Sequence, residues 1–371
     1  MAKNAFPDEI LKKRSKETDV DTVRGEYFRD QTKIIHSQPF RRLKSKTQVF
    51  AAPDNDHICT RIEHVLHVAT VAVSVCKGLK QYGWELDEEL AFAIGLAHDL
   101  GHAPFGHEGE AALNAKVQPE RFIHEINGYR IVEHLTNYGR GLNLTYAVKD
   151  GIICHCGEDF SNNNIKPAAV PNDLEKIKDR KNFPSTYEGC IVRASDKIAY
   201  FGRDLEDALR AKIIKFSDIP DNVKNELGEN NGEIIQSLVT DLTEASKDKD
   251  YIAFSEEKFA MLRQMYAFNV KYIYQHPALV TSRAKLKDAL GRLFDFYLQV
   301  FCAYGFRNCP VREKNPAVRK FCNYLGVMKP VYIRENAGAK TIVTDYIAGM
   351  TDSFALECIE DALGKKIEVS V

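Results

Sequence analysis

Three features are scarce or absent in this sequence of 371 residues: an excess of one charge sign, a long hydrophobic run and an apolar leader. Lysine and arginine number 51 against 52 aspartates and glutamates, so the whole surface is not built to bind nucleic acid. The longest apolar stretch, residues 65–76, is interrupted by polar side chains and too short to cross a bilayer. The first residues lack a signal-peptide core, so we expect a cytoplasmic protein without a membrane anchor.

The nine cysteines are odd in number and irregularly spaced. This pattern favours reduced thiols over a disulfide framework. Cys154 and Cys156 flank His155 and could form a soft-metal site, but no second cysteine pair with zinc-finger spacing supports one. We therefore expect incidental thiols.

Histidine, in contrast, is concentrated in one region. Nine of the 11 histidines lie within 99 consecutive residues, at positions 57, 64, 67, 98, 102, 107, 124, 134 and 155. An even scatter would place far fewer there. We expect the chemistry of the protein in this quarter of the chain.

The hydrophobic pattern is mainly helical. Apolar residues recur at helical spacing over residues 62–80, 90–100, 191–211, 233–246, 256–275, 283–303 and 345–363. Residues 331–333 and 341–343 could form a short β-hairpin. We expect a mainly α fold with an N-terminal arm (1–25) that becomes ordered on assembly, a catalytic core (26–211) and a C-terminal helical region (212–371) packed on that core.

Residues 31–53 contain no acidic side chain but five cations, Lys33, Arg41, Arg42, Lys44 and Lys46. Such a run is usually a solvated basic face. It could equally form a wall that faces phosphate groups, and composition leaves both interpretations open.

Four polar residues in apolar surroundings come from three predicted helices: His64, His98, Asp99 and Asp196. A carboxylate inside a buried helix is costly unless it is paired or binds a cation. Neighbouring side chains project about 100° apart on a helix, so His98 and Asp99 can both reach one ion. Imidazole and carboxylate together suit a divalent metal such as manganese, magnesium, iron, nickel or zinc.

The segment after His98 carries more ionisable groups. His102 follows four residues later, and His107 comes after a Pro-Phe-Gly turn. Glu110 could orient His107 or exchange protons with it, as a general acid or base requires. The alternative is a tight loop whose histidines are merely exposed to solvent.

Asp196, Tyr200 and Asp204 share a helical face because they are spaced four residues apart. Lys197 follows the first of them. A carboxylate, a phenol and a cation fit the metal, sugar and phosphates of a nucleotide, whereas structural salt bridges are the alternative.

The order His64, His98–Asp99, Asp196 resembles the signature of the HD-domain phosphohydrolases. Five phrases narrow the resemblance to the deoxynucleoside triphosphate triphosphohydrolases, the dGTPase-like family: FRRLKSKTQVF (40–50), TRIEHVLHVA (60–69), HDLGHAPFGHEGE (98–110), ASDKIAYFGRDLED (194–207) and DYIAGMTDSFAL (345–356). The similarity runs from about residue 24 to residue 363. It implies the HD-domain helical phosphohydrolase fold with a C-terminal helical extension.

The resemblance also implies residue roles. The metal ligands would be His64, His98, Asp99 and Asp196. The catalytic pair would be His107 with Glu110, while His102 and His124 would meet the phosphates or position water. Substrate contacts would come from Gln48, Arg42, Arg61, Lys197, Tyr200 and Asp204. His67 stands where relatives often carry an acidic residue, and we interpret it as a neighbour of His64 rather than an extra ligand.

The implied reaction is metal-dependent hydrolysis of a dNTP, with dGTP-like substrates, at the α-phosphorus to deoxynucleoside and tripolyphosphate. Two alternatives stay open: an HD-family nucleotidase or signalling-nucleotide hydrolase, and a non-catalytic nucleotide-sensing oligomer. Family members form homo-oligomers, commonly hexamers built from dimers, and some bind a dNTP effector or single-stranded DNA. Arg307, Arg312 and Lys314 could serve an effector site, although a solvated loop is the favoured interpretation.

Overall fold

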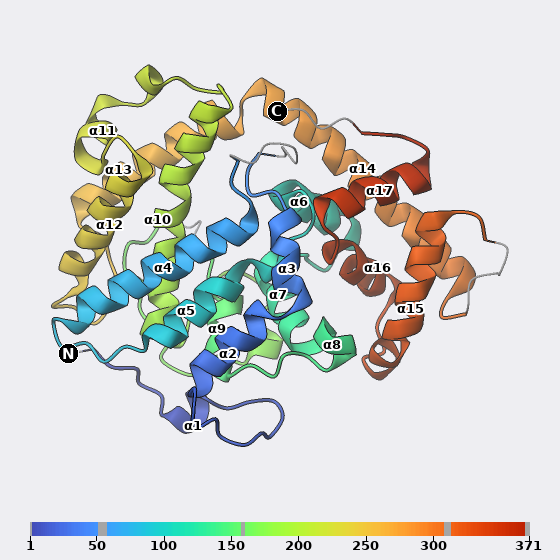
Figure 1. Ribbon diagram of the computed structural model, residues 1–371, viewed down its shortest axis with the longest axis horizontal. Helices are drawn as coiled ribbons and strands as arrows, with labels where there is room; N and C mark the ends of the chain where they lie inside the picture. The colour runs from blue at the N-terminus through green and yellow to red at the C-terminus, as the bar shows by residue number, and fades with distance from the viewer. Residues whose placement is uncertain (1, 51–57, 157–159, 308–312, 368–371) are drawn as a thin grey trace.

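The computed structural model describes residues 2–50, 58–156, 160–307 and 313–367, and these segments are mainly helical (Figure 1). The described chain contains isolated β-bridges, such as Lys3 with Glu85, but no extended sheet. The expected mainly α fold is confirmed. Its helices are α1 (Asp8–Leu11), α2 (Glu26–Ile35), α3 (Gln38–Arg42), α4 (Arg61–Lys80), α5 (Glu88–Ala97), α6 (Gly106–Val117), α7 (His124–Arg130), α8 (Thr136–Gly139), α9 (Tyr146–Ile153), α10 (Tyr187–Arg210), α11 (Asp221–Leu227), α12 (Asn231–Ser246), α13 (Glu256–Phe268), α14 (Pro277–Tyr304), α15 (Pro316–Arg334), α16 (Ala339–Ala348) and α17 (Asp352–Leu363).

The β-hairpin expected at residues 331–333 and 341–343 is wrong. The first of these segments ends α15 and the second lies in α16. Asn315 caps the start of α15, since its side-chain oxygen accepts a hydrogen bond from the backbone nitrogen of Ala317 at 2.8 Å. Val331 is buried in the C-terminal core. Tertiary packing therefore overrides the local β preference of these branched residues.

Helix α4 is the centre of the N-terminal core. It packs against α5, α10 and α12, and a capping box between Thr60 and Glu63 fixes its start. Gly95 of α5 allows close crossing, because a Cβ atom there would lie 2.6 Å from the Cα atom of Ala69. By length and composition α4 could cross a membrane, but half of that window is buried inside the fold. The close crossing of α4 and α5 brings the His64 ring within 5.3 Å of the His98 ring, which directly follows α5.

A second hydrophobic core joins α6 to the C-terminal helices. Leu113 of α6 and Leu290 of α14 are both fully buried in it. Figure 1 shows α14 running from beside α13 toward α15–α17. Helix α6, which follows the His98–Asp99 segment, therefore packs on the C-terminal region.

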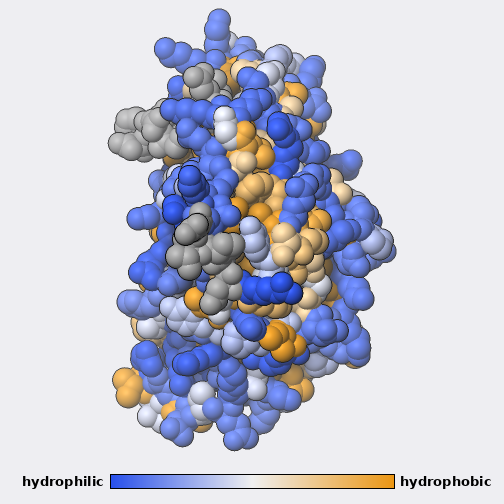
Figure 2. All heavy atoms as spheres, turned by 90° about the vertical axis from the view of Figure 1, so that its right-hand side faces the viewer, coloured by the Kyte–Doolittle hydropathy of each residue, from blue (hydrophilic) through white to orange (hydrophobic). Residues whose placement is uncertain are grey.

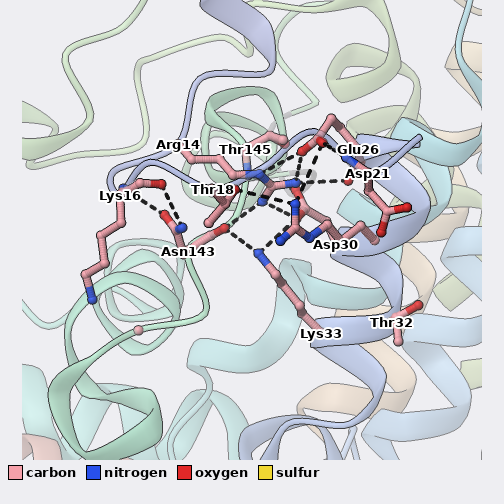
Figure 3. A network of polar contacts seen from close by, with 12 residues as sticks. Arg14, Lys16, Thr18, Asp21, Glu26, Asp30, Thr32, Lys33, Asn143 and Thr145 are labelled. Carbon is pink, nitrogen blue, oxygen red and sulfur yellow. Dashed lines mark hydrogen bonds and ion pairs between the residues drawn. The ribbon is translucent and has the colours of Figure 1, made fainter. Parts of the chain in front are cut away.

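The N-terminal arm is held by buried ion pairs (Figure 3). The Arg14 guanidinium lies 2.6 Å from the Asp30 carboxylate and donates a hydrogen bond to Glu26 at 2.8 Å. It also donates to the carbonyl oxygen of Asn143 at 2.6 Å. Asp30 is fully buried and accepts a further hydrogen bond from the backbone nitrogen of Thr145. The arm is thus tied by buried contacts to α2 and to the segment before α9 of its own chain.

Cysteine chemistry differs from expectation at one position. Cys322 on α15 is disulfide-bonded, so the expectation of reduced thiols is wrong there. Cys154 and Cys156 are free and buried.

The side of the molecule formed by the C-terminal helices carries exposed apolar residues. Figure 2 shows apolar side chains gathered along the middle of this face with hydrophilic residues around them. On α15, Val327 is 51% exposed and Ile333 is 59% exposed.

Candidate active site

A cavity of about 320 Å³ brings together the N-terminal start of α4, the segment between α5 and α6, and one face of α10. His64, Asp99 and Asp196 line it. Tyr274 and Arg283, from the region after α13, line it as well. Five histidines of the histidine-rich quarter line this cavity, at positions 64, 102, 107, 124 and 155.

The four expected metal ligands converge at this cavity. The Nε2 atom of His64 lies 3.0 Å from Oδ1 of Asp196, and the Nε2 atom of His98 lies 3.9 Å from the same oxygen. Asp99 places one carboxylate oxygen 3.8 Å from His64 Nε2 and the other 3.6 Å from His98 Nε2. His64, His98 and Asp196 are a donor set whose ligand atoms lie within 4.8 Å of one another.

The donor set fits a divalent ion. His98 is fully buried and its Nδ1 atom hydrogen-bonds to the Gly95 carbonyl oxygen at 2.7 Å. Its Nε2 atom has no hydrogen-bond partner although it is buried. Burying such an atom without a partner costs free energy, and a coordinated cation would supply the partner. Imidazole and carboxylate donors are the usual ligands of divalent transition metals.

Asp99 lies beside the guanidinium group of Arg61 and the imidazole ring of His102. Its carboxylate lies 2.6 Å from Nη1 of Arg61 and 3.1 Å from Nε2 of His102. Burial alone would raise the pKa of Asp99, but the neighbouring histidines and Arg61 outweigh burial and hold this pKa well below its usual value. The Nε and Nη2 atoms of Arg61 are buried without hydrogen-bond partners. Two guanidinium donors are thus left for a ligand.

The sequence suggested that Glu110 pairs with His107. In the structure, Glu110 pairs with His124. His124 Nδ1 lies 2.7 Å from one Glu110 oxygen, and Arg180 donates to the other oxygen at 2.7 Å. Burial would lower the pKa of His124, but Glu125 and Glu110 outweigh it and raise this pKa to about 9. His107 lines the cavity, and the His102 ring stacks on the His124 ring at 3.8 Å.

A carboxyl–phenol pair closes the other end of the cavity. Tyr200 and Asp204 of α10 line it, and the Tyr274 hydroxyl donates a hydrogen bond to Asp204 at 2.5 Å. Burial raises the pKa of Asp204 to about 7. Arg283 donates to the Tyr274 carbonyl oxygen at 2.9 Å, which links this wall to α14.

Two expected substrate contacts lie elsewhere. Arg42 lines a separate cavity of about 370 Å³ beside α15–α17 and donates to the carbonyl oxygen of Gly349 at 2.9 Å. Lys197 is buried with its ammonium 4.5 Å from the centre of the Phe160 ring, and it does not line the active-site cavity. Gln48, Arg61, Tyr200 and Asp204 do line that cavity.

The five cations of the basic stretch at residues 31–53 do not line this cavity, although Gln48 and Val49 of the same stretch do. Lys33 donates to the Asn143 carbonyl oxygen at 2.7 Å. Lys46 is buried and donates to the carbonyl oxygens of His102 and Ala348. These cations hold the fold together instead. His57 and Arg312, which the sequence singled out, lie outside the described residues.

Sequence reasoning missed several residues at the site. Arg180 comes from a loop-rich insertion, and nothing in its local sequence indicates that it contacts the site. Tyr274 and Arg283 are far along the chain and belong to no motif. His155 received no role, although its place in the histidine-rich quarter was a signal. His67 lies in neither the cavity lining nor the donor sets.

Comparison with known proteins agrees with this geometry. The HD domain matches residues 61–222, and the phosphohydrolase-associated domain matches residues 319–361. A deoxyguanosinetriphosphate triphosphohydrolase-like protein of Caldanaerobacter subterraneus subsp. tengcongensis is 36% identical over 92% of this chain and 86% of its own length. One from Clostridium tetani is 33% identical over 94% of this chain and 88% of its own.

The fold is also shared with a solved structure. A phosphohydrolase from Bacteroides thetaiotaomicron matches with a TM-score of 0.51 and 15% identity, covering 95% of this chain and 72% of that one. The HD donor set, the helical fold and the relatives that match along most of their length agree with one another. The chain therefore belongs to the deoxyguanosinetriphosphate triphosphohydrolase-like family of HD-domain phosphohydrolases.

Proposed function

We propose that this protein is a metal-dependent dNTP triphosphohydrolase, which cleaves dNTPs (dGTP-like substrates) at the α-phosphorus to deoxynucleoside and tripolyphosphate. The observation that carries the proposal is the order of groups along one cavity. A metal donor set lies beside unsatisfied guanidinium donors and histidines, and Tyr200 with Asp204 follows along α10. That order matches the order of phosphate and sugar in a nucleotide.

His64, His98, Asp99 and Asp196 would hold a divalent ion, of which manganese, magnesium, iron, nickel and zinc are the options. Such an ion polarises a phosphoryl oxygen and lowers the pKa of a bound water. The residues set its position. The nitrogen of His98 that faces the donor set is fixed because Gly95 holds the other ring nitrogen.

The remaining residues would bind the phosphates. Arg61 has two buried donors without partners, which suit the oxygens of an anion. The nearby glutamates raise the pKa of His124 to about 9, so His124 would place a positive charge beside the phosphates. Glu110 and Arg180 fix the orientation of its ring. His102 and His107 complete the wall.

The sugar would lie against α10. Asp204 is a hydrogen-bond acceptor when ionised, so it can receive a sugar hydroxyl, and Tyr200 lies one turn earlier on the same face. Gln48 lines the cavity from the N-terminal segment and would meet the base or sugar.

The test is product analysis. Purified protein is incubated with each dNTP, alone and in pairs, with Mn²⁺ or Mg²⁺, and the products are separated by anion-exchange chromatography. We expect equal amounts of deoxynucleoside and tripolyphosphate, and none after chelation or in the Asp196→Asn variant. Pyrophosphate with a dNMP, or no turnover in any mixture, would contradict the proposal. Cleavage of a dNMP or of guanosine tetraphosphate in preference to dNTPs would favour the nucleotidase alternative.

We also propose that the chain forms a homo-oligomer. The exposed apolar side chains of Val327 and Ile333 on α15 support this proposal because exposed apolar patches often mark protein interfaces.

A further inference from the structure

A second cavity lies among the C-terminal helices and takes no part in the proposed hydrolysis. Its volume is about 370 Å³, and residues of α3, α8, α15, α16 and α17 contribute to its lining. It has no described lining residue in common with the active-site cavity. Cavities of this size commonly bind small molecules. We call it the C-terminal cavity.

The walls of the C-terminal cavity are mainly apolar and aromatic. Met328 of α15 and Met350, which follows α16, are buried in the lining, and Phe354 of α17 is half-buried there. The rings of Tyr324 and Tyr346, 4.7 Å apart, add an aromatic side. Thioethers adapt to the shape of a ligand, and aromatic rings pack well against other rings. The walls therefore suit a flat aromatic ligand.

An exposed cation of the cavity has no carboxylate partner. Within the described chain Arg42 forms no ion pair, and its guanidinium donates to the Gly349 carbonyl oxygen at 2.9 Å. Asp345, the carboxylate of the described lining, already accepts two hydrogen bonds from Arg130, at 2.8 and 2.7 Å. Guanidinium groups pair strongly with carboxylates. Arg42 therefore favours a ligand with a negative charge.

The backbone at the edge of the cavity is unfavourable for residues with side chains. Asn137 and Tyr138 of α8 both line the cavity in the left-handed region, with φ angles of 53° and 58°. The Tyr138 side chain is 73% exposed, so packing in the core does not explain its position. Such conformations are concentrated at ligand sites. This segment is therefore shaped as expected for the edge of a binding site.

The C-terminal cavity lies directly behind the segment that carries Asp99 and His102. Leu100 lines the C-terminal cavity, whereas its neighbour Asp99 lines the active-site cavity. Lys46 also lines the C-terminal cavity, and its buried ammonium donates to the carbonyl oxygens of His102 and Ala348. A ligand in the C-terminal cavity would therefore contact residues that hold a wall of the active site.

We propose that the C-terminal cavity binds a small aromatic carboxylate, with the carboxylate on Arg42 and the ring system among the methionine and tyrosine side chains. A nucleoside triphosphate does not suit it, because a triphosphate needs several cations and Arg42 is the one exposed cation among the described lining residues. Through Leu100 and Lys46 the bound ligand restrains residues 98–102. The proposal does not rest on the proposed function, since the two sites share no described residue.

The experiment compares 2-naphthoate with its uncharged analogue 2-naphthamide by isothermal titration calorimetry of the full chain. We expect one 2-naphthoate per chain, bound about tenfold more tightly than 2-naphthamide because of the charged hydrogen bond to Arg42. Arg42→Met should abolish this difference, and Arg42→Lys should restore part of it. Arg41→Met is the matched control, because Arg41 is exposed on the same helix and does not line the cavity.

Hydrogen–deuterium exchange then locates the bound probe. In the natural protein 2-naphthoate should slow amide exchange in residues 349–354 and in residues 98–102. Arg42→Met should show neither effect at the same concentration. Unchanged exchange in residues 98–102 alone would overturn the link to the active site.

No binding of 2-naphthoate, equal affinity for the two probes, or an unchanged difference in Arg42→Met would overturn the site. Displacement of 2-naphthoate by dGTP, with the same residues protected, would overturn the carboxylate assignment in favour of a nucleotide. Slower exchange confined to residues around Asp196 would place the probe in the active-site cavity and also overturn the proposal. If Arg42→Met does not fold, the two probes and the exchange pattern of the natural protein decide. A lack of dNTP hydrolysis would contradict only the proposed function.

Discussion

Asp352 accepts a hydrogen bond from the backbone nitrogen of Phe105 at 2.9 Å, although the two residues are 247 positions apart in the chain. Its other oxygen accepts from the backbone nitrogen of Thr47 at 2.8 Å and from the Thr47 hydroxyl. Phe105 has a φ angle of 63°, a left-handed conformation that is unfavourable for a residue with a side chain. It directly precedes α6, which carries His107 and Glu110. The first residue of α17 therefore positions part of the active site.

Replacing Asp352 with alanine should weaken both the fold and catalysis. The amide groups of Phe105 and Thr47 lose their acceptor, and each unsatisfied buried donor costs about 1–3 kcal/mol. The α6 start can then shift, and a shift of about 1 Å lowers kcat by up to about 100-fold. Thermal unfolding and steady-state dNTP hydrolysis measure the two effects. Asp352→Asn should lose less, because it keeps one acceptor oxygen. The exposed neighbour change Ser353→Ala is the control, and an unchanged kcat in Asp352→Ala would refute the positioning role.

Arg180→Met should lower kcat while leaving the metal content unchanged. Arg180 lies 2.7 Å from Glu110 and 2.8 Å from Glu125 and holds both carboxylates, which also face His124. Its removal frees the Glu110 side chain and lets the His124 ring turn. Kinetics and elemental analysis check the prediction. Lys181→Met is the matched control, since the Lys181 side chain is 89% exposed. Equal kcat values for the two variants would show that Arg180 does not orient the site.

The pH dependence of stability should change in Asp204→Asn. Burial raises the pKa of Asp204 from 3.8 to about 7. Between these values the folded protein keeps the proton that the unfolded chain has lost, so the free energy of unfolding falls as pH rises through this window. The Asp204→Asn variant has no carboxyl group at this position, so its free energy of unfolding should not fall in this way as pH rises. Urea unfolding at pH 4, 5.5 and 8 should show the variant gaining stability, relative to the natural protein, by up to a few kcal/mol. Parallel pH profiles would contradict the assignment.

The same carboxyl should affect substrate use. Only ionised Asp204 is a pure acceptor for a sugar hydroxyl, so kcat/KM for a dNTP should rise as pH passes through about 7. In Asp204→Asn this rise should be missing. Initial rates across pH, with metal held at saturation, measure it.

Charges on α15 should dissociate the proposed oligomer. Val327 and Ile333 are about half exposed, and burying them between chains would stabilise an assembly. We expect light scattering after gel filtration to give an oligomer for the natural protein and a smaller species for Val327→Glu with Ile333→Glu. Val280→Glu, which changes an exposed apolar residue at the start of α14, should have no effect. A monomeric natural protein would contradict the proposal.

The mutual placement of some candidate site residues was predictable because their signal is local. His98 and Asp99 are adjacent, and Tyr200 and Asp204 are one helical turn apart, so the sequence itself determines how they face one another. The partner of Glu110 was not predictable, because it depends on the close approach of α7 to residues 98–101. At Gly101 a Cβ atom would lie 1.9 Å from the His124 carbonyl oxygen. That contact brings His124 to Glu110, and no spacing in the chain reveals it.

The cationic side chains were harder to place than the candidate metal donors. The sequence gives the positions of Arg42 and Lys197 along the chain but not the directions in which their side chains point. Lys197 is next to Asp196 on α10, yet adjacent side chains diverge by about 100°, and its ammonium packs on Phe160. The hairpin error at residues 331–333 has a similar origin. Branched residues favour strands locally, but burial in the C-terminal core decided the outcome.

The two ends of the cavity come from different parts of the chain. The candidate metal donors lie between His64 and Asp196, whereas Tyr274 and Arg283 line the cavity from the segment around the start of α14. Mutations in that later segment can reshape the space for base and sugar without disturbing the ion ligands. New substrate preferences can therefore evolve in this protein, or be selected in the laboratory, while the hydrolytic chemistry is inherited unchanged.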